Sequence, residues 1–299
     1  MDISISDTDY PGLYQAADAE STHAQTCYFR CLYWFLLLLT FGAIANLFVA
    51  SNLSALVATS LFLAALLFSA LLAWKRYDRT WFSARAVAES VKTLTWRYMM
   101  CAEPYQAALS NIEVRKLFLS DLQEILKENQ EITKELCDES ASQDPISPTM
   151  DTVRGLTASD RLSFYIKKRI LEQGGWYSRK AKTNKKDGAK WFFGIVILNG
   201  LAILCSIFRI AFLNWSYLPT DVFAVAAASA VCWLQAKRFT ELSTSYALTS
   251  HEITIIRGRV PTVASEDELS QFVSDTENAF SREHTQWAAR RDARCRTIR

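Results

Sequence analysis

The longest apolar run in the chain extends from Cys31 to Trp74, where 44 consecutive residues include no Asp, Glu, Lys or Arg. One transmembrane helix needs about 20 mostly apolar residues, so this run is long enough for two helices, with a break at residues 50–53. We therefore predict a transmembrane hairpin over 31–74, in preference to a buried hairpin of a soluble protein. A cleaved signal peptide is excluded, because the apolar block is too long and starts too late.

A second, weaker apolar region predicts another hairpin over residues 191–236. Its first span, 191–208, has 18 residues without charge, and Arg209 follows at the far end. Its second span, 222–236, is shorter and rich in Ala. Small residues four apart let helices approach closely in lipid, so we expect this span to be packed inside a bundle. The predicted fold class is an all-α membrane protein with two transmembrane helical hairpins, which gives four spans.

Basic residues indicate the orientation of both hairpins. Arg76 follows the second span, Lys190 precedes the third and Lys237 follows the fourth, whereas the connecting turns have almost no positive charge. Lys and Arg are enriched at the cytoplasmic ends of spans. We therefore expect a multi-pass protein with both termini in the cytoplasm.

Two segments that directly follow the hairpins have seam residues at alternating spacings of three and four. These are Tyr77, Trp81, Ala84, Ala88, Val91, Thr95 and Tyr98 in the first, and Phe239, Leu242, Tyr246, Thr249, Ile253, Ile256 and Val260 in the second. The pattern is the heptad seam of helices that pack along their length. We predict one continuous helix leaving the membrane after each hairpin, packed against its counterpart or against neighbouring subunits. A helix lying flat on the membrane is the alternative. The candidate residues of an oligomer seam are Tyr77, Trp81, Phe239, Tyr246, Ile253 and Ile256.

The layout therefore repeats once along the chain. The predicted ranges are a cytosolic N-terminal segment (1–30), a transmembrane hairpin (31–74), cytosolic helices (75–138), a linker (139–160), a basic cytosolic lead-in (161–190), a second hairpin (191–236) and further cytosolic helices (237–299). Lys-Arg-Tyr at 75–77 and Lys-Arg-Phe at 237–239 follow their hairpins at an offset of 162 residues. This offset suggests a duplication. Residues 265–268, Ser-Glu-Asp-Glu, match a capping box and start the last helix.

Candidate chemistry is sparse. The net charge of +2 gives no sign of nucleic-acid binding, and the chain has no glycine-rich phosphate loop, nucleophile elbow or zinc-protease motif. The three His and seven Cys are scattered, so we predict no metal site, no cofactor and no enzyme activity. The short group of Ser, Glu and His at 281–287 favours a structural or partner-contacting role over catalysis.

Polar residues in the third span carry the remaining functional hypotheses. Asn199, Ser206 and Arg209 are the candidate pore-lining residues, because polar side chains in hydrocarbon mark water-filled paths or helix contacts. Arg209 either snorkels to the outer interface or lines such a path. A basic cluster before this span, with Lys182, Lys185 and Lys186, is a candidate site for anionic headgroups or for a nucleotide phosphate.

Several longer segments resemble a known family. "WFSARAVAESVKTLTWRYMMCAEPY" (81–105) resembles the segment that follows the hairpin in SLATT domains, which are two-transmembrane effector domains associated with bacterial SMODS and SLOG proteins. "WYSRKAKTNKKDGAKWF" (176–192), "AKRFTELSTSYALTSHEI" (236–253) and "SDTENAFSREHTQWAARR" (274–291) resemble another SLATT subtype. The chain is thus identified as two tandem SLATT domains of different subtypes.

The resemblance implies a bacterial conflict-system effector in the inner membrane. Such domains are thought to form pores or perturb the membrane, with growth arrest or cell death during phage infection as the result. The implied partners are the lipid bilayer, further copies of the chain, and a nucleotide second messenger or a cytosolic sensor protein. Two hypotheses compete: a homo-oligomeric gated pore, and a non-conducting membrane scaffold that recruits a cytosolic signalling partner. The polar third span and the Ala-rich fourth span favour the pore.

Overall fold

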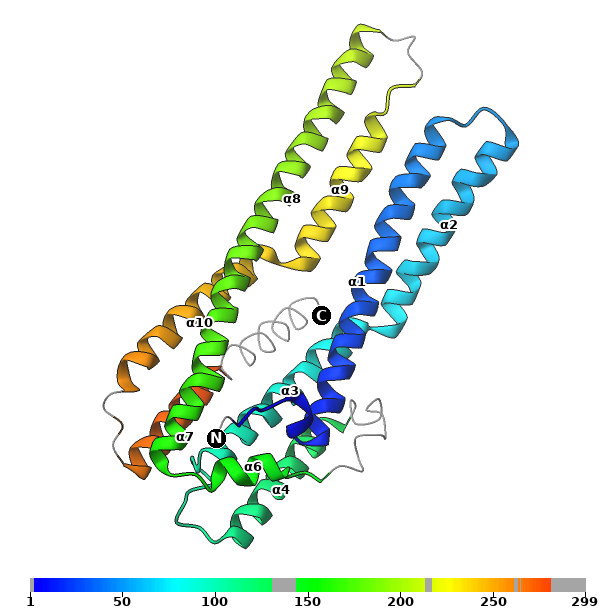
Figure 1. Cartoon of the computed structure of the whole chain (residues 1–299). Helices are drawn as coiled ribbons and strands as arrows, with labels where there is room; N and C mark the ends of the chain where they lie inside the picture. The colour runs from blue at the N-terminus through cyan, green and yellow to red at the C-terminus, as the bar shows by residue number, and fades with distance from the viewer. Residues whose placement is uncertain (1–2, 131–143, 213–216, 261–262, 264, 281–299) are drawn as a thin grey trace. The chain divides into compact units, whose positions relative to one another are not determined.

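The computed structural model describes residues 3–130, 144–212, 217–260, 263 and 265–280, and no strand occurs among them (Figure 1). The helices are η1 (Asp7–Asp9), α1 (Gly12–Leu47), α2 (Asn52–Lys75), α3 (Tyr77–Met99), α4 (Asn111–Glu128), α6 (Pro148–Arg154), α7 (Ala158–Tyr165), the π-helical turn η3 (Ile166–Leu171), α8 (Glu172–Ala211), α9 (Thr220–Lys237) and α10 (Phe239–Arg259). Residues 266–280 form a further helical segment.

The chain divides into two compact units, which we name by their contents. The hairpin unit consists of Gln25–Tyr77 and Lys180–Thr244, and the helical body consists of Met1–Ala24, Asp78–Arg179 and Ser245–Arg299. Segments far apart in the sequence meet in each unit, because the chain passes from body to hairpin and back twice.

The hairpin unit confirms the predicted all-α membrane fold. In the part of the chain that the structure describes, four helices are long and apolar enough to cross a membrane, and the lowest mean hydropathy, 1.2, belongs to the helix that contains α9. The sequence predicts that the second hairpin is the weaker one; this holds for its second span, but the helix that contains its first span has a mean hydropathy of 2.2, above the 1.6 of α1. The chain is therefore a multi-pass membrane protein with two helical hairpins, α1–α2 and α8–α9.

The first hairpin turns where its sequence predicts. Helix α1 ends at Leu47, and Ser51 caps α2 by accepting a hydrogen bond from the Ser54 N–H at 3.3 Å. Before the turn, α1 and α2 approach closely at Gly42, where an added Cβ would lie 2.8 Å from the Phe62 ring. A side chain at position 42 would therefore require the Phe62 ring to move.

Aromatic side chains connect the two hairpins within the hairpin unit. Trp233 of α9 contacts Phe29 and Tyr33 of α1, with ring centroids 5.8 and 6.2 Å apart, and it also contacts Trp191 at 6.1 Å. Ala227 and Ala230, on the same helix, are buried. The fourth span is therefore packed among other helices, as its small residues predict.

One continuous helix follows each hairpin, as predicted (α3 and α10), but a single residue separates each of them from the span before it. Arg76 separates α2 from α3 and Arg238 separates α9 from α10, and both have the left-handed backbone conformation, with φ of 48° and 52°. A residue in this conformation ends a helix. No glycine or proline marks either position, so the local sequence gave no signal for the break.

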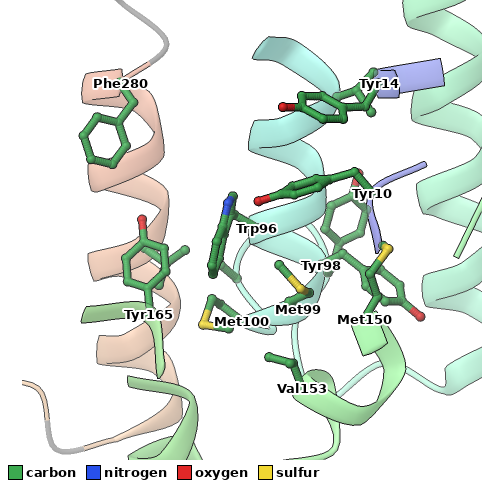
Figure 2. Close-up of a cluster of buried hydrophobic side chains, with 14 of the residues drawn as sticks. Tyr10, Tyr14, Trp96, Tyr98, Met99, Met100, Met150, Val153, Tyr165 and Phe280 are labelled. Atoms are coloured by element: carbon green, nitrogen blue, oxygen red, sulfur yellow. The ribbon is translucent and has the colours of Figure 1, made fainter. Parts of the chain in front are cut away.

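An aromatic and methionine-rich core fills the helical body. Figure 2 shows Trp96 between Tyr165 on one side and Tyr10 on the other, and its ring contacts that of Tyr165 edge-on at 5.6 Å. Met99 and Met100, at the end of α3, are fully buried. The core therefore joins the N-terminal segment, α3 and α7, and the residues before the first span are part of the packed body.

The expected linker over 139–160 is only partly seen, because residues 139–143 lie outside the described residues. From 148 onward the range holds α6 and the start of α7, separated by residues 155–157. Ser147 caps α6 by accepting from the Met150 N–H at 3.2 Å, and Thr157 caps α7. Met150 and Val153 are buried, because α6 packs its apolar face on the body core.

The predicted capping box at the last helix is confirmed, since Ser265 and Glu268 exchange hydrogen bonds of 3.0 and 3.2 Å.

Candidate functional site: the third span and the core of the helical body

The candidate pore residues lie on one exposed face of the third span. Asn199 and Ser206 are seven residues apart, two turns of an α-helix, and Arg209 lies about 60° further round the helix, since each residue turns it by about 100°. All three side chains are exposed, and none of the residues in the apolar window of α8 is buried. The structure thus brings the three residues together on a surface that no described part of the chain covers.

Local hydrogen bonds reduce the cost of these polar groups in lipid. Asn199 donates from Nδ2 to the Ile195 carbonyl at 2.9 Å, and Ser206 donates from Oγ to the Ala202 carbonyl at 3.0 Å. Both bonds satisfy donors within the helix and leave the side-chain oxygens facing outward as acceptors. Arg209 forms no ion pair with a described residue, so its charge needs water, lipid headgroups or another chain.

The candidate seam residues have partners within their own units. In the helical body, Ile253 is 2% exposed and its Cγ2 would lie 3.1 Å from a Cβ added at Gly174, while the ring of Tyr246 lies 5.4 Å from that of Trp176. Ile256 packs on the same core. The seam of α10 therefore packs against α8 in one chain.

The remaining seam residues are half-buried. Tyr77, Trp81 and Phe239 all keep part of their surface exposed. In the hairpin unit, Phe239 lies against Gly188, where an added Cβ would be 3.2 Å from the Phe239 Cβ. An interface between subunits through these residues stays a prediction.

The basic cluster before the third span is on the surface of α8. Lys182, Lys185 and Lys186 are exposed, and their spacing of three and four places them on one side of the helix. Headgroup or phosphate binding by this cluster stays a prediction.

A buried ion pair fixes the last described helical segment to the body. Glu277 is 0% exposed and accepts two hydrogen bonds from Arg169, at 2.9 Å from Nε and 2.8 Å from Nη2. Tyr165 donates to the same carboxylate at 2.8 Å, and Thr93 donates at 3.3 Å. Burial and the neighbouring Glu277 raise the pKa of Tyr165 well above its ordinary value, so the hydroxyl stays a donor.

The π-helical turn η3 supplies one half of this pair. Arg169 lies in η3, which interrupts the otherwise continuous helix from α7 to α8, and its guanidinium stacks 4.8 Å from the Phe280 ring. A π turn shifts the helix face by one residue and is frequent at functional positions. Sequence reasoning missed this cluster, although Arg161, Tyr165 and Arg169 recur at a spacing of four. That spacing on one helix face was the available signal.

Two basic residues near the first seam, Arg85 and Lys92, have different kinds of partner in the helical body. Arg85 forms an ion pair with Glu89 on the next turn and another with Asp18 at 2.9 Å. Lys92 lies over the rings of Tyr10 and Tyr14, at 5.8 and 5.6 Å from their centroids. Burial lowers the pKa of Lys92, and the aromatic faces offset part of the cost of its charge.

No group of three or more His, Cys, Asp or Glu is placed to hold a metal ion in the part of the chain that the structure describes. The 281–287 segment lies outside the described residues. What the described chain presents is thus a membrane surface with polar residues and a packed helical body with an ion-paired core.

Comparisons with known proteins agree with this architecture. Residues 11–162 match the SMODS and SLOG-associating 2TM effector domain 3, and residues 165–287 match the SMODS and SLOG-associating 2TM effector domain 1. No curated protein and no solved structure matches the chain. Each matched range contains one hairpin and the helices around it, and both families are membrane effector domains of conflict systems, not catalytic families. The chain therefore belongs to the SLATT family, with a domain of subtype 3 followed by one of subtype 1.

Proposed function

We propose that this chain is a membrane effector of a bacterial conflict system that assembles from several copies into a gated pore, or otherwise perturbs the inner membrane, and so arrests growth or kills the cell. The observation that carries the proposal is the exposed polar face of the third span, with Asn199, Ser206 and Arg209. In a single copy this face would contact lipid, where polar groups are unfavourable. Contact with other copies around a water-filled path would solvate it.

The fourth span supports the same assembly. Ala227 and Ala230 are buried within the hairpin unit, but Ala224 and Ala228 are exposed. Small exposed residues four apart offer a second helix a close approach in lipid. The hairpin unit thus has a packing surface on α9 as well as a polar surface on α8.

The proposed orientation places both termini in the cytoplasm and Arg209 near the outer mouth of the path. A positive ring at a pore mouth disfavours cations. Activation would come from a nucleotide second messenger or a cytosolic sensor protein that acts on the helical body, since the body holds the larger packed core.

Ion flux in liposomes tests the proposal. The full chain, reconstituted and activated, should release trapped ions, and Arg209→Glu should weaken or reverse the preference for anions. Asn199→Leu with Ser206→Ala should reduce flux by about tenfold or more, because the polar face is lost. Leu204→Ala is the matched control, since Leu204 lies on the opposite face of the same helix and is 52% exposed.

Three outcomes decide between the alternatives. Flux that depends on Asn199 and Ser206 but not on Leu204 supports a path along this face. Flux that is equal in all variants supports membrane perturbation without a defined path. Sealed liposomes, together with polarised cells that still arrest growth on expression, contradict the pore and favour a non-conducting scaffold that recruits a signalling partner.

A further inference from the structure

A groove with two cations lies between the first and fourth spans of the hairpin unit. It has a volume of about 440 Å³, and it is lined by Gln25, Thr26, Phe29, Arg30 and Tyr33 of α1 and by Trp233 and Lys237 of α9. Residues more than 200 positions apart thus meet in one concave surface. The sequence pattern alone gave no indication of this meeting.

Aromatic rings hold the lysine in place. The Lys237 Nζ lies 3.5 Å from the centroid of the Phe29 ring and 5.1 Å from that of Trp233. Such cation–π contacts attract the ammonium to the ring faces. They use no N–H donor in a conventional hydrogen bond, and the ammonium has three.

Among the described residues, none supplies a counter-charge in the groove. None of its lining residues is an Asp or Glu, and neither Arg30 nor Lys237 forms an ion pair with a described residue. Two cations that share a concave surface repel each other unless an anion lies between them. The Gln25 side chain on the same wall offers a further N–H donor.

The groove also lies at the ends of two of the predicted spans. Arg30 immediately precedes the charge-free run that starts at Cys31, and Lys237 immediately follows the apolar part of α9. Trp233 and Tyr33 beside them are residues typical of the membrane–water interface. We therefore expect both cations to lie at the level of the phospholipid phosphates.

We propose that this groove binds a phosphate-bearing anion, with Lys237 and Arg30 contacting the phosphate oxygens and the aromatic rings contacting the group attached to the phosphate. The phosphate belongs either to an anionic phospholipid or to a soluble phosphate ester, and the binding chemistry is the same. Bound phosphate would join the first hairpin to the second, because its two cationic contacts come from different SLATT domains. The site does not depend on whether the chain conducts ions.

Lipid retention by the full chain in detergent tests the site. Native mass spectrometry with added phosphatidylglycerol or phosphatidylcholine should show preferential retention of phosphatidylglycerol by the wild type. Lys237→Gln and Arg30→Gln should each lower that retention about threefold or more, and Lys237→Arg should restore it. Lys75→Gln is the matched control, because Lys75 lies at the same place after the first hairpin, 162 residues earlier, and is not part of the groove.

A second arm identifies the source of the phosphate. In nanodiscs of phosphatidylcholine alone, pyrophosphate at millimolar concentration should raise the melting temperature of the wild type, but not of Lys237→Gln, if the site takes a soluble ester. If the wild type prefers phosphatidylglycerol but pyrophosphate does not raise its melting temperature, the site binds a lipid headgroup. If both effects are seen, the site accepts a phosphate from a lipid and from a soluble ester.

Two results would overturn the site. One is that the wild type shows neither a lipid preference nor a pyrophosphate shift. The other is that Lys75→Gln loses as much retention as Lys237→Gln. Since Arg30 is exposed and its substitution does not disturb packing, Arg30→Gln decides the question even if Lys237→Gln fails to fold.

Discussion

Arg76 and Arg238 adopt the same left-handed backbone conformation 162 residues apart. Each donates its N–H to the carbonyl four residues earlier, at 3.2 Å to Leu72 and 3.0 Å to Leu234, and each ends the second span of its hairpin. The left-handed conformation costs about 1–2 kcal/mol for residues other than glycine. Two copies of one unfavourable turn, in the two SLATT domains, indicate that the turn itself is a shared feature of the domain.

Inside a helix an Ala variant is usually more stable than a Gly variant, and at the two turns we expect the opposite. Arg76→Gly and Arg238→Gly should each be more stable than the corresponding Ala variant by about 1 kcal/mol, because glycine adopts positive φ without a Cβ clash. At Arg79, exposed inside α3, the Gly variant should instead be less stable than Ala by about 1 kcal/mol. Melting in detergent, followed by circular dichroism, measures both differences. If the Ala variant were the more stable one at all three positions, Arg76 and Arg238 would not have the left-handed conformation.

The buried ion pair in the helical body predicts a large effect of a single truncation. Glu277→Ala should destabilise the body by about 3–5 kcal/mol, because the buried Arg169 guanidinium is left without its partner. Asp275→Ala is the control two residues away: Asp275 is exposed, and its change should stay within about 0.5 kcal/mol. A combined Arg169→Met and Glu277→Leu variant should be more stable than Glu277→Ala. Equal melting temperatures for the two single variants would show that Glu277 is not buried in the folded protein.

Alkaline pH should destabilise the helical body. The pKa values of the buried residues Tyr10, Tyr98, Tyr105 and Tyr165 are raised above their ordinary value of about 10, mainly because burial disfavours the phenolate. Above about pH 10 the unfolded chain therefore binds fewer protons than the folded chain, so stability falls as pH rises. Lys92 acts in the opposite direction, because its lowered pKa makes its contribution rise with pH towards about 10.4.

Tyr14 is also buried and its pKa is raised by burial, so five tyrosines act against one lysine and stability falls on balance. We expect the melting temperature to fall steadily above about pH 10. Tyr10→Phe should make that fall shallower, because one fewer titrating group differs between the folded and unfolded chains. A melting temperature that stays constant or rises to pH 11 would mean that the tyrosines titrate normally and are not buried.

The sequence predicted the parts of the fold that depend on composition and periodicity. The apolar runs at 31–74 and 191–236 predicted the spans, and the capping box at Ser265 predicted a helix start. The turns at Arg76 and Arg238 could not be predicted, because a left-handed arginine is held by its surroundings and leaves no compositional signal. The same holds for the groove between α1 and α9, since it depends on how two distant helices pack.

The seam patterns show a different limit of prediction from the sequence. Spacing of three and four identifies the buried face of a helix but not its partner. Ile253 is buried as its position predicts, yet its neighbour is Gly174 of the same chain. A seam can pack against a helix of the same subunit or of another subunit. Loop lengths and packing decide which, and the spacing of the seam residues gives no information on either.

Cysteine accessibility tests the proposed topology. In a cysteine-free variant, a single Cys at Asn52 or at Ser216 should react with a membrane-impermeant reagent from outside intact cells. Asn52 is the first residue of α2, and Ser216 lies in the sequence between the predicted third and fourth spans. A Cys at Thr157, which caps α7 in the helical body, should react only after the cells are opened. External labelling at Thr157 would reverse the proposed orientation of both termini.

Paired substitutions on α10 distinguish a seam that supports the fold from one that only joins subunits. Ile253 is 2% exposed and Ile255 is 62% exposed, so the same change has different expected effects two residues apart. Ile253→Asp places a carboxylate among apolar groups beside Gly174, which should cost several kcal/mol and lower the melting temperature or abolish folded protein. Ile255→Asp should keep both the melting temperature and the oligomeric size measured by light scattering in detergent. Stable protein from Ile253→Asp would contradict the core position. Normal folding with dissociated subunits for Ile255→Asp would instead place a subunit interface on the outer face of α10, turned away from the predicted seam.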